Sequence, residues 1–117
     1  THTLRRIIHR KQGLHAMIER GLQDIVALRG VTSVLLVEED GFVVHRTDPE
    51  DSNDVLQISK WLEMTRTVDA QAIITLVMER GYIILKPIAR RTLMVSCERN
   101  VNLGAVRKVL DDLDWAP

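Results

Sequence analysis

The sequence feature that most constrains the fold is a run of four consecutive apolar residues, Val34-Leu35-Leu36-Val37. The run lies in a strand-like segment, residues 31–38, that is rich in β-branched side chains. Successive side chains of a strand point to opposite faces of its sheet, so this run places apolar groups on both faces. A sheet that contains such a strand needs packing above and below it.

Helical periodicity and turn residues place the other elements around this strand. A long amphipathic helix is expected over about 3–28, with a break near Gly13 as the alternative, and Gly30 is expected to end it in a left-handed conformation. Asp40-Gly41 predicts a hairpin turn into a returning strand over 42–47. The other expected features are a helix over 54–68, strands over 72–78, 82–88 and 92–97, a three-residue hairpin loop over 79–81 with Gly81 at positive φ, a helix over 103–113 capped by Asn102, and Trp115 closing the end of the core. This order, α-β-β-α-β-β-β-α, predicts an α+β domain.

Size, charge and cysteine content exclude several classes of protein. The 117 residues suit one domain, and 16 Lys and Arg balance 16 Asp and Glu. A chain without net charge lacks the general field that attracts nucleic acid, and its few aromatics are not interleaved with basic residues as a base-stacking platform would be. No apolar run approaches the roughly 20 residues of a membrane span. The single cysteine, Cys97, permits no intrachain disulfide and fits a reducing compartment. We therefore expect a cytoplasmic protein with no nucleic-acid partner and no membrane span.

Side chains of catalytic or metal-binding type form no recognisable constellation. The four histidines, at 2, 9, 15 and 45, lack metal-ligand spacing, and His15 on the apolar helix face is better interpreted as a core residue. Cys97 ends an apolar strand, where the reactive thiolate is disfavoured. The acidic segment 48–54 lacks the calcium-loop pattern and is interpreted as a solvated helix cap. We expect no enzymatic activity, no cofactor and no bound metal.

Two features predict association with other proteins. Residues 72–78 form a run without charge or proline, which would be an apolar pairing template if it lay at a sheet edge. The helix over 54–68 has an apolar arc of about half its circumference and includes Trp61 and Met64, residue types that anchor interfaces. Periodicity alone is equally compatible with both segments lying in the core of a monomer. The predicted dimer and partner interface comprises Val55, Ile58, Trp61, Leu62, Met64, Thr65, Val68, Ile74, Leu76 and Met78.

Several short motifs, in this order and spacing, resemble the Roadblock domain. The motifs are Gly30-Val31, Asp40-Gly41-Phe42-Val43-Val44, Pro87-Ile88, and Asn102-Leu103-Gly104 with Arg107, and the resemblance covers roughly residues 14–113. The family includes a dynein light chain, subunits of lysosomal signalling scaffolds and bacterial regulators of Ras-like GTPases. On this basis we divide the chain into a basic N-terminal helical extension, 1–13, and a Roadblock-like domain, 14–117.

The resemblance implies a five-stranded antiparallel sheet of profilin-like type, with the two terminal helices on one face and the central helix on the other. It also implies a homodimer in which strand 72–78 pairs with its copy beside helix 54–68. In prokaryotic members, the surface around the paired central helices docks a small GTPase and can stimulate its hydrolysis. The family often has small residues in the central helix where this chain has Trp61 and Met64.

The resemblance predicts a homodimeric, non-enzymatic regulator of a small Ras-like GTPase, acting as an activating or accessory protein. Two alternatives stay open. One is a nucleotide-indifferent scaffold or light-chain-like adaptor, and the other is a profilin-like sensor of a small ligand. A regulator should prefer one nucleotide state of its partner, whereas a scaffold should bind both states equally.

Overall fold

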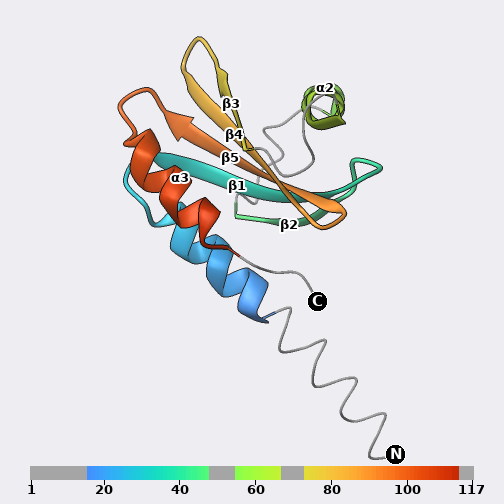
Figure 1. Ribbon diagram of the computed structural model, residues 1–117, viewed down its shortest axis with the longest axis horizontal. Helices are drawn as coiled ribbons and strands as arrows, with labels where there is room; N and C mark the ends of the chain where they lie inside the picture. The colour runs from blue at the N-terminus through green and yellow to red at the C-terminus, as the bar shows by residue number, and fades with distance from the viewer. Residues whose placement is uncertain (1–15, 48–54, 67–72, 114–117) are drawn as a thin grey trace, which may run out of the picture.

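The computed structural model describes residues 16–47, 55–66 and 73–113 (Figure 1). The order of its elements confirms the predicted α+β arrangement. The elements are an N-terminal helix described over 16–26, β1 (Val31–Glu38), β2 (Val43–Arg46), α2 (Val55–Arg66), β3 (Ile74–Val77), β4 (Gly81–Ile88), β5 (Arg91–Glu98) and α3 (Leu103–Asp111). The residues 3–15 of the first expected helix, with His15 and Gly13, lie outside the described residues, as do Thr67, Val68 and Trp115.

The five strands form one antiparallel sheet in the order β2-β1-β5-β4-β3. β1 and β5 run side by side over most of their length, with Val34 opposite Val95 and Leu36 opposite Leu93. This central pairing joins segments about 60 residues apart in sequence. It leaves β2 and β3 as the two outer strands of the sheet (Figure 1).

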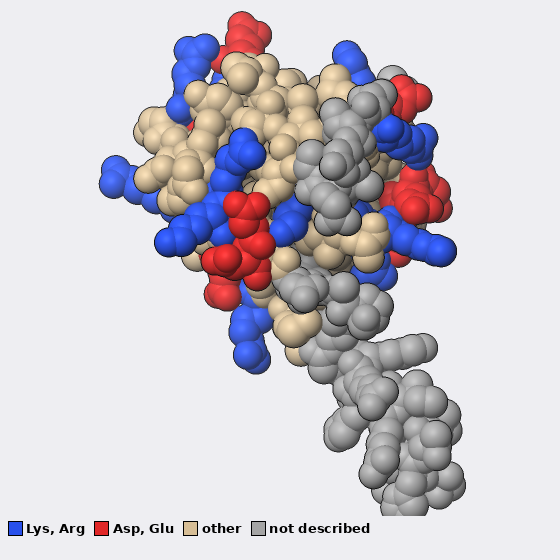
Figure 2. Space-filling model, viewed as in Figure 1, with Lys and Arg blue, Asp and Glu red and all other residues tan. Residues whose placement is uncertain are grey.

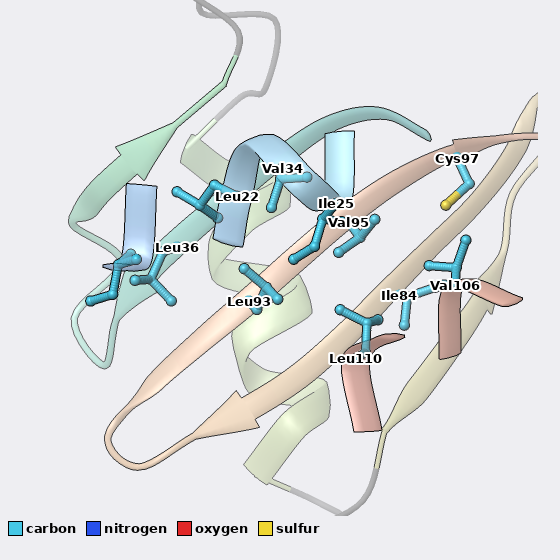
Figure 3. Close-up of a cluster of buried hydrophobic side chains, with 11 residues drawn as sticks. Leu22, Ile25, Val34, Leu36, Ile84, Leu93, Val95, Cys97, Val106 and Leu110 are labelled. Carbon is cyan, nitrogen blue, oxygen red and sulfur yellow. The ribbon is translucent and has the colours of Figure 1, made fainter. Parts of the chain in front are cut away.

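The apolar run in β1 is covered on both faces, as its alternation predicts. Val34 and Leu36 lie in a cluster with the N-terminal helix and α3, which both pack on one face of the sheet (Figures 1 and 3). Leu35 and Val37 lie in a second cluster on the opposite face, which α2 covers. The expected placement of the terminal helices on one face and the central helix on the other is therefore confirmed.

Asn102 caps α3 as predicted, whereas Gly30 has the predicted left-handed conformation but lies beyond the end of the N-terminal helix. It belongs to the turn that the N–H of Val31 closes by donating to the carbonyl of Leu28 at 3.1 Å. Gly30 follows the N-terminal helix with φ of +92°, and a Cβ atom there would lie 2.8 Å from the Cα of Val101. Glycine is thus required at this position both by conformation and by space. Asn102 caps α3, because its side-chain oxygen accepts a hydrogen bond from the backbone N–H of Ala105 at 3.1 Å.

One hairpin turn agrees with the sequence prediction and another does not. Gly41 has φ of +93°, and the backbone N–H of Phe42 donates to Oδ1 of Asp40 at 3.0 Å, so the Asp40-Gly41 turn is confirmed. The prediction for Gly81 was wrong: the residue is not at positive φ but is the first residue of β4. A hydrogen bond of 2.8 Å from the N–H of Met78 to the carbonyl of Gly81 closes a turn of two residues instead of three. Glycine is needed there because β5 passes close to its Cα.

Candidate functional site

β3 lies at the edge of the sheet. The sequence predicts that this apolar strand pairs with another chain if it lies at an edge, so the condition of that prediction is met. It pairs with β4 on one side, from Ile74 opposite Leu85 to Val77 opposite Tyr82. No other strand of the described chain lies along its second side. The outer side of β3 therefore offers backbone hydrogen-bonding groups to a further strand.

The side chains of β3 keep this edge apolar. Ile74 and Leu76 are half-buried and pack against the cluster under α2. Val77 is 79% exposed and Met78 40% exposed, which is unusual for large apolar side chains that lie next to each other. Figure 2 shows an area without charged side chains over β3 and β4, with Lys, Arg, Asp and Glu around it. The predicted set contained Ile74, Leu76 and Met78 but omitted Val77, the most exposed member of the strand.

Thr75 faces the other side of the sheet from Ile74 and Leu76. Its hydroxyl accepts a hydrogen bond of 3.4 Å from Nη1 of Arg107 in α3. This contact joins the open edge to α3. Arg107 is itself one of the residues on which the resemblance to the Roadblock domain rests.

α2 uses much of its apolar arc within the single chain. Ile58, Trp61 and Leu62 are 4%, 5% and 6% exposed and pack against the sheet, so they are core residues before any partner binds. Of the other predicted interface residues on this helix, Met64 and Thr65 are half-buried. The Thr65 hydroxyl donates to the carbonyl of Leu62 at 2.6 Å. Val55 begins α2, but its side chain is outside the described part of the structure, as is Val68.

The structure brings the two predicted interface elements together. Ile74 and Leu76 of β3 contact the same cluster that holds Ile58, Trp61 and Leu62 of α2. A partner strand added to β3 would therefore lie beside the surface that α2 presents. The outward positions of α2 on that surface are polar or charged: Gln57, Ser59, Lys60, Glu63 and Arg66 are exposed.

Groups with catalytic potential form no cluster in the described residues. Cys97 is buried in the cluster under the terminal helices, and loss of hydration raises the pKa of its thiol from 9.0 to about 11. The thiolate that a nucleophile needs is therefore scarce at neutral pH. His45 lies half-buried in β2. Among residues 16–47, 55–66 and 73–113, His, Cys, Asp and Glu form no group of three or more that could hold a metal ion. The acidic segment 48–54 and the histidines at 2, 9 and 15 lie outside these ranges.

None of the helices in the described ranges combines the length and the apolar character that crossing a membrane requires.

Comparison with known proteins identifies the fold. Neither a protein-family model nor a curated protein sequence matches the chain. Among solved structures, it is similar to a Roadblock/LC7 domain from Streptomyces avermitilis, with a TM-score of 0.67 and 10% identity over 78% of this chain and 86% of that one. It is also similar to MglB with a tetrameric arrangement, with a TM-score of 0.68 and 14% identity over 84% and 82% of the two chains. MglC from Myxococcus xanthus matches with a TM-score of 0.58 and 16% identity over 80% and 89%.

These identities are low, so the likeness is one of fold. The chain has the Roadblock/LC7 fold, and the resemblance read from its short motifs is confirmed at that level.

Proposed function

We propose that this chain forms a homodimer through β3 and α2, and that the dimer regulates a small Ras-like GTPase without catalysing a reaction of its own. The observation that carries the proposal is the open, uncharged edge of β3 in a Roadblock fold. Pairing two copies of this edge would satisfy its backbone groups and cover Val77 and Met78. A solved neighbour of the same fold, MglB, is described with a tetrameric arrangement, which supports self-association as a use of this architecture.

The dimer proposal is tested by adding a charge to the edge strand. Leu76→Lys buries an unpaired ammonium at the proposed seam and should weaken the dimer by about 2 kcal/mol or more. Because Leu76 also packs against the core, Val77→Lys provides a second variant whose side chain is already exposed in the single chain. Phe42→Lys is the matched control, since it replaces another exposed apolar residue, 67% exposed, in the hairpin at the opposite edge of the sheet.

Light scattering after size-exclusion chromatography gives the mass of each variant at low micromolar concentration. The expected result is a dimer for the parent chain and for Phe42→Lys, and a shift to monomer for the two β3 variants. A fully dimeric Val77→Lys variant, together with a fully dimeric Leu76→Lys variant, would exclude β3 as the seam.

The regulatory part of the proposal concerns the surface that α2 presents beside β3. If this surface binds one arrangement of the GTPase's switch loops more tightly than the others, binding shifts the GTPase toward that arrangement. This chain would then supply no chemistry of its own. We assign no side chain of α2 as a catalytic arginine finger. Arg66 is the arginine on this helix, and its Nη2 donates to the backbone carbonyl of Glu39 at 3.1 Å within the chain. A regulator of this kind would act in the cytoplasm, where the buried Cys97 stays reduced.

The experiment that tests this part is affinity capture from source lysate with GDP or a non-hydrolysable GTP analogue, analysed by mass spectrometry. We expect a small GTPase to be retained in one nucleotide state and not in the other. A paired charge reversal on the exposed positions of α2, Lys60→Glu with Glu63→Lys, should abolish that retention while the dimer persists. If large partners were retained equally with GDP and with the GTP analogue, the nucleotide-indifferent scaffold would be favoured instead. A scaffold could also use the open edge of β3 to bind its partners.

A further inference from the structure

A groove of about 540 Å³ lies where α2 ends, between the β1–β2 hairpin and the turn that joins β4 to β5. Its apolar surface includes Leu62 and Pro87, and three arginines line it: Arg66, Arg90 and Arg91. Glu39 is the one acidic residue among its lining residues in the described chain. Three arginines thus face one glutamate among the lining residues, and Glu38, which pairs with Arg91, lies beside them; one more arginine than glutamate remains, in a protein whose overall charge is zero.

Two of the three guanidinium groups are held in place by neighbours on the β1–β2 hairpin. Arg91 pairs through Nε with Oε1 of Glu38 at 3.2 Å, with the two side chains 38% and 39% exposed. Arg66 donates from Nη2 to the backbone carbonyl of Glu39 at 3.1 Å. Each contact uses only part of the donor capacity of a guanidinium, which carries five N–H groups. Donors therefore remain on both side chains for a ligand.

The third guanidinium, Arg90, lies in the turn itself. It is exposed, and no hydrogen bond or ion pair joins it to the rest of the described residues. The residue before it, Ala89, has φ of +56° and is the one non-glycine residue of the described chain in the left-handed region. Ala89 and Arg90 form the two-residue turn between Ile88 and Arg91, a kind of turn that requires positive φ, and this turn holds Arg90 outward at the end of the hairpin.

The shape of the groove indicates what kind of anion it would bind. It is open to solvent, and an ion pair between exposed groups contributes little by itself because water and salt screen it. A single small anion would thus be held weakly. A chain segment with several carboxylates could pair with more than one arginine and place an apolar side chain against Leu62 and Pro87.

We infer that this groove is a docking site for an acidic peptide segment of a partner protein, bound by Arg66, Arg90 and Arg91. Charge complementarity identifies the occupant, and the position of the site at the end of α2 places it away from the open edge of β3. The inference does not depend on the proposed dimer or on a GTPase.

Fluorescence anisotropy with a labelled Glu-Glu-Leu-Glu-Glu peptide tests the inference on the full chain. We expect binding that weakens as the salt concentration rises. Arg90→Glu should weaken it roughly three- to tenfold, because it replaces an attraction by a repulsion at an exposed site. Arg99→Glu is the matched control: the same charge change at an exposed position in the β5–α3 connection should leave the affinity unchanged.

Nuclear magnetic resonance of the labelled chain locates the site. Shifts from the peptide should be concentrated at Thr65, Arg66 and the backbone of 89–92, and Arg90→Glu should reduce them. Equal loss of binding in Arg90→Glu and Arg99→Glu would overturn the inference. A failure to observe salt-sensitive binding at concentrations of the binding partners up to about 1 mM would overturn it as well. Inorganic phosphate that binds as tightly as the peptide and shifts the same resonances would overturn the assignment to a peptide.

Discussion

A methyl group on Gly81 would lie 2.0 Å from the backbone carbonyl oxygen of Cys97. Gly81 begins β4 and is paired with Glu98, next to Cys97 on β5, so the crowding atom belongs to the backbone of the neighbouring strand and cannot rotate away. Gly81→Ala should therefore force β4 and β5 apart and lower the free energy of unfolding by about 2–3 kcal/mol. Urea unfolding followed by circular dichroism measures this loss.

Gly104→Ala is the control for this substitution. A Cβ there would meet nothing nearer than the side-chain oxygen of Asn102 at 3.5 Å, and Gly104 lies in the first turn of α3. Alanine should stabilise the helix by about 0.5 kcal/mol. If both variants changed stability by the same amount and sign, the close approach of β5 would not be the reason for glycine at 81.

The left-handed turn at Ala89 predicts a gain in stability from glycine. Because a Cβ is strained at φ of +56°, Ala89→Gly should raise the free energy of unfolding by about 0.5–1 kcal/mol. The same substitution in a helix should have the opposite sign, so Ala105→Gly, at an exposed position of α3, should lose about 0.5–1 kcal/mol. Thermal or urea unfolding of the two variants separates the effects, and a loss of stability in Ala89→Gly would contradict the prediction.

Lys86 of β4 anchors the C-terminal end of α3. Its Nζ donates to the backbone carbonyl of Leu113 and to that of Leu110, which also accepts from the N–H of Leu113 at 3.2 Å. Lys86→Met keeps the aliphatic length but removes the donor, and should lower the free energy of unfolding by about 1–3 kcal/mol. Hydrogen exchange should accelerate in the last turn of α3. Lys60→Met, at an exposed position of α2, should change stability by less than about 0.5 kcal/mol.

Burial of Cys97 makes stability depend on alkaline pH. Its pKa is raised in the folded chain to about 11 from 9.0, so the folded state holds its proton where the unfolded state has lost it. The stabilising contribution is fully present below about pH 9 and is lost as the pH rises through about 11. Compared with Cys97→Ala, the parent chain should show a steeper fall in stability over this interval. If the free energy of unfolding fell equally with pH in the parent chain and in Cys97→Ala, the raised pKa of Cys97 would be contradicted.

The thiol itself offers a second measurement. Iodoacetamide reacts with the thiolate, so Cys97 should be alkylated slowly in the folded chain at neutral pH and rapidly after denaturation. Fast alkylation of the native chain would show that Cys97 is more accessible than its burial indicates.

Local sequence determined the identity and order of the elements in this protein. The alternation of Val34-Leu35-Leu36-Val37 required two covered faces, and the structure has them. Gly30, Gly41 and Asn102 act through their own backbone or side chain within a few residues, so their positions in turns and caps could be predicted without knowledge of the fold. The arrangement of the helices on the two faces came from the resemblance to the Roadblock domain.

Tertiary structure decided the features that depend on residues distant in sequence. Periodicity left Trp61 as either a core or an interface residue, and packing on the sheet made it core. Gly81 is explained by a neighbouring strand and not by its own turn. The edge position of β3 follows from the pairing of β1 with β5, and the arginine groove is built from residues 66, 90 and 91 on different elements. Turns and caps depend on local dihedral preferences, whereas burial, strand order and grooves depend on which distant surfaces meet, and that information is not local to any stretch of the chain.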